Sequence, residues 1–322
     1  MKSPTHYLAE NIDVLLSKLP GIRDGDPEAI HDARVATRRI REALPIVRTA
    51  VANIDLEPVE VTARKAGRAL GRTRDLGVAL DLIRELERRA PQIARSVSAL
   101  RCDLLWEHAA AQRRLVKKID ALPIEEVRAI GQRLGARTWW AGRPRSVKRE
   151  MLHTVREQAG SLRAVIFHGS GVYFPKRAHA TRIDMKKLRY VLEIAQPAAT
   201  RGLELLKKTQ TVLGKLHDRE FLRERLERLE GAGSTQSQHD PSLPVLLQAE
   251  CATLYAQYLR RRDALLELCA DLERSGEWAW STPVGVGGAL VGAGAVATTA
   301  WLLAARPTRE TPRTESTVRR AS

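Results

Sequence analysis

The side chains of this chain that are best suited to chemistry are cations repeated at helical spacing. His31, Arg34, Arg38 and Arg41 follow one another at intervals of three, four and three residues. At about 100° per residue, a helix would hold all four within roughly a quarter of its circumference. Phosphate oxygens suit such a surface, because they accept charge-assisted hydrogen bonds worth ~1.5–3 kcal/mol each where water is excluded. The spacing therefore predicts a helix with one basic side, a surface whose chemistry suits oxyanions.

The same pattern occurs a second time in the chain. At one constant offset, His31, Arg34, Arg38, Arg39, Arg41 and Leu44 correspond to His179, Arg182, Lys186, Lys187, Arg189 and Leu192. A later Leu-Gly element that ends in Asp75 likewise has a counterpart that ends in Asp218. Two blocks that recur in the same order indicate an internal duplication.

These doubled motifs resemble those of the CHAD domain family, a family of α-helical domains with characteristic histidines. The similarity extends from about Thr5 to Arg274 and includes both halves of the duplication. The resemblance implies two four-helix bundles related by a pseudo-two-fold axis, with a basic central cavity that binds inorganic polyphosphate. It also implies that the protein is found with polyphosphate granules.

On this resemblance, we expect the two cationic helices to face each other across a basic trough. One wall would consist of Arg34, Arg38, Arg41, Lys65 and Arg72, and the other of Arg182, Lys186, Arg189, Lys208 and Lys215. His31 and His179 would donate hydrogen bonds, more strongly when protonated. The alternative is that the cations only pair with the acids Asp32, Glu42, Asp75, Asp184 and Asp218. For Asp75 and Asp218, the sequence leaves open whether they orient neighbouring cations or pair locally.

The elements that must position these cations are predicted to be helices. Residues 5–19 have apolar side chains at helical spacing, and Asp26-Pro27-Glu28 is a favourable start for the first basic helix. Pro45 predicts a kink or an early end in that helix. Further helices are expected at about 58–89, 91–120, 148–168, 175–197, 200–230 and 243–274. No segment has the alternation of a strand, so we predict an all-α fold of two four-helix bundles related by internal duplication.

The predicted domain organisation follows from these helices and from the composition of the segments between and after them. It comprises a first bundle at 5–122, a connector at 123–147, a second bundle at 148–274, a transmembrane candidate at 281–305 and a disordered basic tail at 306–322. The connector is expected to include a short helix.

Residues 281–305 contain no charged side chain and are long enough to cross a bilayer. They include Gly288 and Gly292 at GxxxG spacing, and tryptophans lie near both ends, as in many membrane spans. The alternative is a low-complexity tail that packs on the domain or stays disordered. A span would make the protein a membrane-tethered scaffold.

The location of the folded part is expected to be cytoplasmic, either tethered to the inner membrane or with polyphosphate granules. The first residues contain no apolar run of signal-peptide length, and a large domain is exported only with such an address. The arginines of 306–322 instead favour a cytoplasmic tail after the span. These two arguments conflict over the orientation of the segment.

The charge of the chain favours a polyanionic partner. It has 54 Lys and Arg against 38 Asp and Glu, a net charge of +16, and such an excess attracts polyphosphate, nucleic acid or anionic membrane. Nucleic acid is the less favoured partner, because aromatic residues make up only 4% of the chain and bases bind by stacking on aromatic rings. The three cysteines are widely spread and form no CxxC pair, which fits a reducing compartment.

No catalytic pattern emerges, and we expect a binding protein without a cofactor or metal. His31-Asp32 and His217-Asp218 spell the HD pair of some phosphohydrolases, but neither pair is retained in the other copy of the duplication. Adjacent helix residues also point about 100° apart, so an HD pair needs further ligands to hold a metal. The chain has no GxxxxGK[ST] phosphate loop and no ExExK motif of triphosphate-tunnel enzymes.

Overall fold

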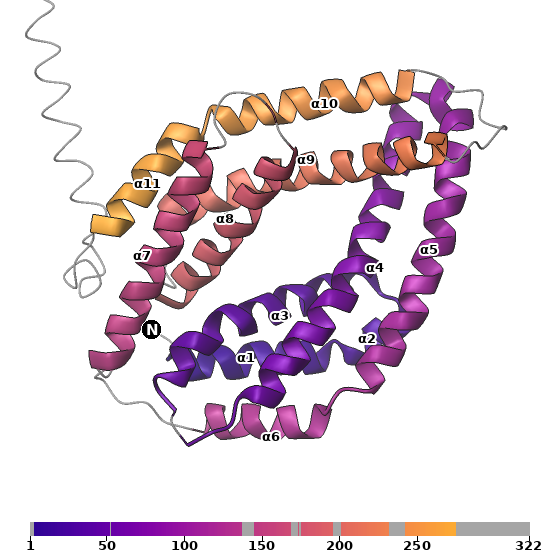
Figure 1. The fold of residues 1–322 in the computed structure, drawn as a ribbon. Coiled ribbons are helices and arrows are strands. Elements are labelled where there is room, and N and C mark those ends of the chain that lie inside the picture. The colour runs from indigo at the N-terminus through magenta and orange to yellow at the C-terminus, as the bar shows by residue number, and fades with distance from the viewer. Residues whose placement is uncertain are drawn as a thin grey trace, which may run out of the picture. The chain divides into compact units, whose positions relative to one another are not determined.

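The computed structural model describes residues 3–51, 53–136, 145–168, 173, 175–195, 201–231 and 242–274. In these ranges the chain forms α1 (Pro4–Ser17), α2 (Leu19–Asp24), α3 (Pro27–Arg48), α4 (Glu57–Arg89), the short 3₁₀ helix η1 (Pro91–Ile93), α5 (Ala94–Asp120), α6 (Ile124–Gly135), α7 (Arg145–His168), α8 (Pro175–Ala195), α9 (Arg201–Gly231), α10 (Ser242–Leu259) and α11 (Arg262–Arg274), as Figure 1 shows. The described residues include no strand, so the all-α prediction is confirmed.

Helix α3, the first basic helix, begins where its sequence predicts. Asp26 accepts hydrogen bonds from the backbone N–H groups of Glu28 and Ala29, at 3.0 and 3.3 Å, and Pro27 occupies the first helical position. The helix does not end at Pro45 but continues to Arg48. Pro45 cannot donate to the carbonyl of Arg41, one turn before it, but only three helical residues follow it, so this loss falls near the end of the helix.

Within each half, the helices pack on one another in the same order. In the first half α1 packs on α3, α3 on α4, α4 on α5, and α6 on α1; in the second half α7 packs on α8, α8 on α9, α9 on α10, and α11 on α7. The halves also meet directly, because α3 contacts α8 and α4 contacts α9. This order of neighbours is the one that an internal duplication would produce, and the duplication itself stays a prediction.

The short helix expected in the connector is present, and one segment predicted as a single helix is two helices. The segment expected as a connector contains α6, whose Val127, Ile130 and Leu134 are buried. Gly131 lets α6 approach α1 closely, since a β-carbon there would lie 3.0 Å from Cγ2 of Ile12. The last predicted helix is two helices, α10 and α11, with the break at residues 260–261.

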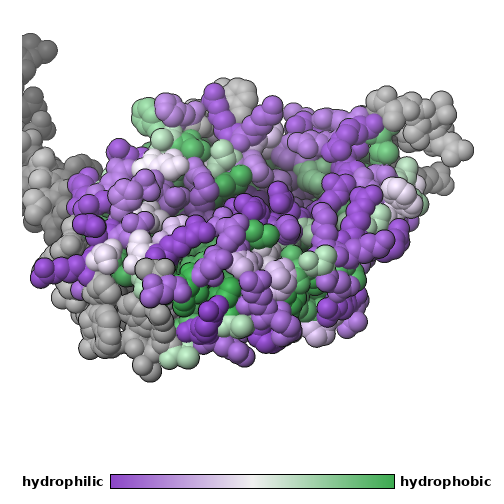
Figure 2. Space-filling view, turned by 60° about the horizontal axis from the view of Figure 1, so that its bottom comes forward, coloured by the Kyte–Doolittle hydropathy of each residue, from purple (hydrophilic) through white to green (hydrophobic). Residues whose placement is uncertain are grey.

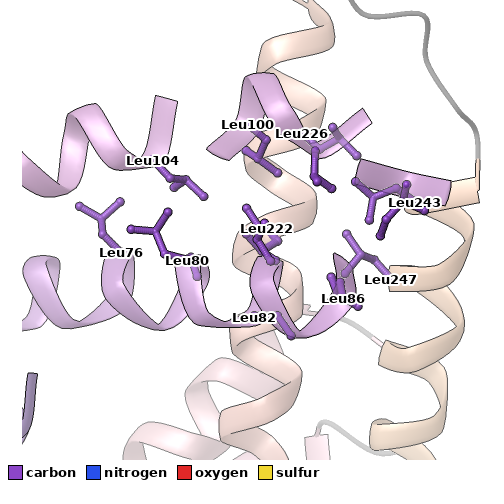
Figure 3. Packing of buried hydrophobic residues seen from close by; sticks show 14 of the residues in the cluster. Leu76, Leu80, Leu82, Leu86, Leu100, Leu104, Leu222, Leu226, Leu243 and Leu247 are labelled. Atoms are coloured by element: carbon purple, nitrogen blue, oxygen red, sulfur yellow. The ribbon is translucent and has the colours of Figure 1, made fainter. Parts of the chain in front are cut away.

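The two halves share a hydrophobic core. Leucines of α4 and α5 pack with leucines of α9 and α10, among them Leu76, Leu86, Leu100, Leu222 and Leu247, and Figure 3 shows them converging. Long helix α4 runs from α6, which it also contacts, to this cluster (Figure 1). The shared core therefore holds α4 and α9, which carry part of the site described below, in a defined relation.

Truncation of Leu222 tests whether this core joins the halves. Leu222 is 1% exposed within the cluster, and emptying such a site costs about 2–5 kcal/mol. We expect Leu222→Ala to lower the free energy of unfolding by about 3 kcal/mol in a single cooperative transition, measured by urea denaturation. The control, Leu105→Ala on exposed α5 surface, should change it by less than about 0.5 kcal/mol. Two separate transitions, only one of them shifted, would show that the halves unfold independently.

The face of the molecule shown in Figure 2 is largely polar. Figure 2 shows hydrophilic residues over most of the face in view, with hydrophobic residues showing between them. Among the helices that the structure describes, none combines the length and apolarity needed to cross a bilayer. The transmembrane candidate at 281–305 and the tail at 306–322 lie outside the described residues, so both stay predictions.

Candidate functional site

Four helices bring charged and titratable side chains together where the halves meet. Helix α3 contributes residues at successive turns, and α8 contributes their counterparts, while α4 and α9 each contribute one adjacent pair. We call this set the central cluster: His31, Arg34, Arg38, Arg74, Asp75, His179, Arg182, Lys186, His217 and Asp218. Both sides come together because α3 packs on α8 and α4 on α9.

Arg74 connects the two halves inside the central cluster. Its Nη1 donates to Oδ1 of Asp75 at 3.2 Å and to Oδ1 of Asp218 at 3.4 Å. Oδ1 of Asp75 also accepts a hydrogen bond from Nη2 of Arg34 at 3.3 Å. Each aspartate therefore binds an arginine from another helix, and Asp75 pairs with its chain neighbour Arg74 as well.

The imidazole rings of the second half lie against each other. The ring centroids of His179 and His217 are 4.9 Å apart, and the rings are tilted by 44°. Burial, followed by the positive charges of Arg182 and Lys186, lowers the pKa of His179. Burial and the charge of Arg182 lower the pKa of His217 to about 3. Both rings are neutral at pH 7 and each has one N–H to donate.

The central cluster carries an excess of positive charge in a partly buried place. It holds three arginines of the first half, together with Arg182 and Lys186 of the second. Among the described residues, the carboxylates that accept hydrogen bonds from these cations are those of Asp75 and Asp218. Arg182 is 6% exposed, and its Nε–H is buried without a hydrogen-bond partner among the described residues. A buried donor without an acceptor is costly, and an anion would satisfy it.

The pKa of Lys186 reflects both its burial and this positive field. Burial, and then the charges of Arg182, Arg38 and Arg34, lower the pKa of Lys186 to about 5. Burial and the charge of Arg38 also lower the pKa of Arg34, to about 10. In the absence of an anion, Lys186 is therefore neutral at pH 7, although the sequence suggests a cation at this position.

The other acids named from the sequence do not neutralise the cluster. Asp32 pairs with Lys18 at 2.8 Å, and Asp184 pairs with Lys187 at 3.1 Å while accepting from Ser161. Burial raises the pKa of Glu42, against the lowering effect of Arg41, Lys187 and Arg38. Of all the acids named from the sequence, Asp75 and Asp218 form ion pairs with arginines of the central cluster. These two pairs do not neutralise all its cations, so the cluster keeps a net positive charge.

The structure brings six of the twelve predicted site residues together: His31, Arg34, Arg38, His179, Arg182 and Lys186. Arg72 instead donates to Glu107 of α5, at 3.2 Å. Arg189 lies over the ring of Tyr190, 4.5 Å from its centroid, and 3.6 Å from Glu193. The remaining four, Arg41, Lys65, Lys208 and Lys215, are exposed on α3, α4 and α9.

Two central residues were missing from the sequence-based set of cations and donors. Arg74 and His217 each precede one of the central aspartates, and they occupy matching positions in the two copies. The sequence shows that Arg74-Asp75 corresponds to His217-Asp218. This correspondence argues against a metal-binding HD pair, but it does not indicate that Arg74 and His217 lie at the centre. Within the described ranges, no group of three or more His, Cys, Asp or Glu side chains has an arrangement that could hold a metal ion.

Contacts outside the cluster hold α3 and α8 in place. Nε of Arg39 lies 3.1 Å from Oε2 of Glu193 on α8, and the Tyr7 hydroxyl of α1 donates to the same oxygen at 3.5 Å. The charge of Glu193 thereby raises the pKa of Arg39, against the lowering effect of burial. These bonds cross between the halves beside the central cluster, and they favour a pre-organised site.

Comparisons with known proteins agree with this architecture. A family model described as the CHAD domain matches residues 6–227. No curated protein sequence matches the chain. The crystal structure of the CHAD domain from the plant Ricinus communis matches over 86% of this chain and 93% of that one, with a TM-score of 0.52 and 19% identity, a likeness that concerns the fold alone. Since the family model spans more than half of its residues, the chain belongs to the CHAD domain family.

Proposed function

We propose that the protein binds inorganic polyphosphate in the central cluster and catalyses no reaction on it. The observation that supports this most is the meeting of Arg34 and Arg38 with Arg182 and Lys186, from opposite halves. Among the described residues, the carboxylates hydrogen-bonded within this cluster are those of Asp75 and Asp218. A polyphosphate chain carries a negative charge on each unit, and its oxygens accept hydrogen bonds from guanidinium groups in bidentate fashion. Family membership supports the same partner.

The shape of the cluster favours a thin linear anion. The side chains from His31 to Arg38 extend along roughly 10 Å of helix, so they suit several phosphate units in a row. The Arg34 and Arg74 side chains are only 13% and 20% exposed. A DNA duplex carries its phosphates on the outside of a broad helix, so it presents less of its backbone to such a partly buried place than a single thin chain does. Polyphosphate has no bases to accommodate.

Equilibrium titration with polyphosphate of defined length tests the proposal. We expect binding that weakens steeply as salt rises, because the polymer's counterions are released on binding. Polyphosphate should displace a fluorescent DNA duplex of equal phosphate number at a concentration at least about tenfold below that at which DNA displaces polyphosphate. Equal competition would instead support a general polyanion binder, and no binding at low salt would overturn the proposal.

The non-catalytic part of the proposal has its own readout. Polyphosphate incubated with the protein, with and without Mg²⁺, should keep its length on a gel and release no free phosphate. Phosphate release that is lost in a central-cluster variant would contradict this part and leave the binding part standing.

A further inference from the structure

A second basic surface lies between α4 and α5, outside the central cluster. A groove of about 310 Å³ there is lined by cations of both helices over an apolar floor of Ala69, Ala111 and Leu115. The lining cations are Arg68 and Arg72 of α4 and Arg114 and Lys118 of α5, and the lining includes no carboxylate. We call this the α4–α5 groove.

The positive charge of the groove is largely unmatched. Glu107 receives a hydrogen bond from Arg72, at 3.2 Å, but it is also bound by both Nη atoms of Arg225. For the described part of the chain, the structure gives no hydrogen bond or ion pair to Arg68, Arg114 or Lys118. An anion would therefore meet three cations that no acid has engaged.

A neighbouring surface on α4 shows that this imbalance is specific to the groove. Further along the helix, a pocket is lined by Asp81, Arg84, Glu87 and Arg88, two acids and two bases. Arg84 pairs with Asp81 at 2.8 Å, and Glu87 pairs with Arg101 of α5 at 2.9 Å. Helices α4 and α5 thus pair their cations with acids at one end, whereas at the groove most of their cations have no acidic partner among the described residues.

The groove lies next to the central cluster around α4. Gly71 packs against Arg34 of the cluster, since a β-carbon there would lie 3.5 Å from Nε of Arg34. On an α-helix, Arg68 and Arg72 lie roughly 60° and 100° around from Gly71, in the same direction. Moving around α4 from the central cluster therefore leads directly to the cations of the groove.

We propose that the α4–α5 groove is a second binding site for phosphate groups, which holds the continuation of a polyphosphate chain bound at the central cluster. The inference rests on the proposed function. The groove has the volume of about ten water molecules, at ~30 Å³ each, so it has room for a short run of phosphate units. Its apolar floor keeps water from one side of the anion, which strengthens the attraction to the four cations.

Counting bound tripolyphosphate tests the inference, because this anion is too short to follow the whole path. Isothermal titration at low salt should detect two tripolyphosphate molecules on the natural protein. Arg114→Glu with Lys118→Glu should remove one of them and weaken the binding of long polyphosphate at least about tenfold. Arg38→Glu with Lys186→Glu should remove the other and leave the groove site occupied.

The matched control is Arg88→Glu with Arg260→Glu. It changes the net charge equally, and both side chains are exposed outside the two sites. It should leave the stoichiometry at two and weaken long chains by less than about threefold. Arg114→Gln with Lys118→Gln provides a milder pair should the charge reversal fail to fold.

The outcomes separate the two proposals. If both groove pairs leave the stoichiometry and the long-chain affinity unchanged in folded protein, the groove site is excluded while the central site stands. If only the central pair leaves binding unchanged, the proposed function fails and the groove is the phosphate site. If the groove pairs remove one tripolyphosphate without weakening long chains, the groove binds phosphate but does not continue the same chain.

Discussion

Reversing two charges in the central cluster, with Arg38→Glu and Lys186→Glu, should weaken polyphosphate binding at least about 100-fold. Both positions lie where the halves meet, within the field of Arg34 and Arg182. Each reversal removes a donor to the phosphates and adds a repulsive charge beside them. A hundredfold weakening corresponds to about 2.7 kcal/mol, which the removal of one charge-assisted hydrogen bond to phosphate on each side would account for.

The same variant should fold at least as stably as the natural protein. The cations of the unliganded cluster repel one another, and after burial this repulsion is what lowers the pKa values of Lys186 and Arg34. A glutamate at either position meets arginines, so it relieves that repulsion. We expect a melting temperature that is unchanged or higher, measured by circular dichroism, while polyphosphate binding is abolished or greatly weakened. Such opposite effects are typical of sites that give up stability for function.

The control for this prediction is again the pair Arg88→Glu with Arg260→Glu. It lowers the formal net charge equally, with one exposed position in each half. Because it changes only the long-range field of the protein, it should weaken binding by less than about threefold. If the control and the central variant weaken binding equally, polyphosphate responds to net charge alone and the central cluster is not its site.

Polyphosphate binding should take up protons and tighten as the pH falls from 8 to 5. In the free protein the pKa of Lys186 is lowered to about 5, first by burial and then by Arg182 and Arg38. Bound phosphates place negative charge beside the amine, so its pKa rises in the complex. Between these two pKa values the complex holds a proton that the free protein lacks. Affinity should then rise by up to about tenfold per pH unit for each proton taken up.

Calorimetry in buffers of different ionisation enthalpy measures this uptake directly. At pH 7 we expect on the order of one to two protons per binding event, because the pKa values of His31, His179 and His217 are lowered in the free protein as well. Lys186→Met should remove the part of the proton uptake that is due to this lysine. Lys176→Met, at an exposed position, should leave the proton uptake unchanged. Proton release, or no proton exchange at pH 7, would contradict the prediction.

In the absence of polyphosphate, the folding stability of the protein should depend on pH through the same lysine. The pKa of Lys186 is 10.5 in an unfolded chain and about 5 in the folded one. Between these values the unfolded state binds one more proton, so the lysine makes folding stability rise with pH. Polyphosphate should reduce that dependence, because the bound phosphates let the folded protein keep the proton. Chemical denaturation at several pH values, with and without the polymer, measures both slopes.

The positions of the helices, and the division of each basic helix into a cationic and an apolar side, follow from the local sequence. The spacing of His31, Arg34 and Arg38 is a property of one helix, and so is the burial of Ala36 and Ile40 on its opposite side. The first three of these indeed lie together in the structure. The repeat of the motif also indicated which residues of α8 correspond to them. Interactions between residues three or four apart need no knowledge of tertiary packing.

The residues that α4 and α9 add to the site could not be predicted in this way. Whether Arg72 or Arg74 of α4 points to the centre depends on how that helix is rotated between α3, α5 and α9. The structure turns Arg74 toward Asp218 and Arg72 toward Glu107. Helix rotation is decided by the packing of the shared leucine core, whose members are far apart in the sequence.

By itself, the amino-acid sequence determined an all-helical chain with two cationic helices and a motif typical of the CHAD domain family. Only the tertiary structure decided that Arg34 and Arg182 share one cluster, that Arg74 bridges its halves, and that Lys186 is neutral without an anion. The reason is physical. Helix periodicity is a local property of the backbone, whereas the pKa and the partners of a side chain depend on burial and on charges that packing brings from elsewhere in the chain.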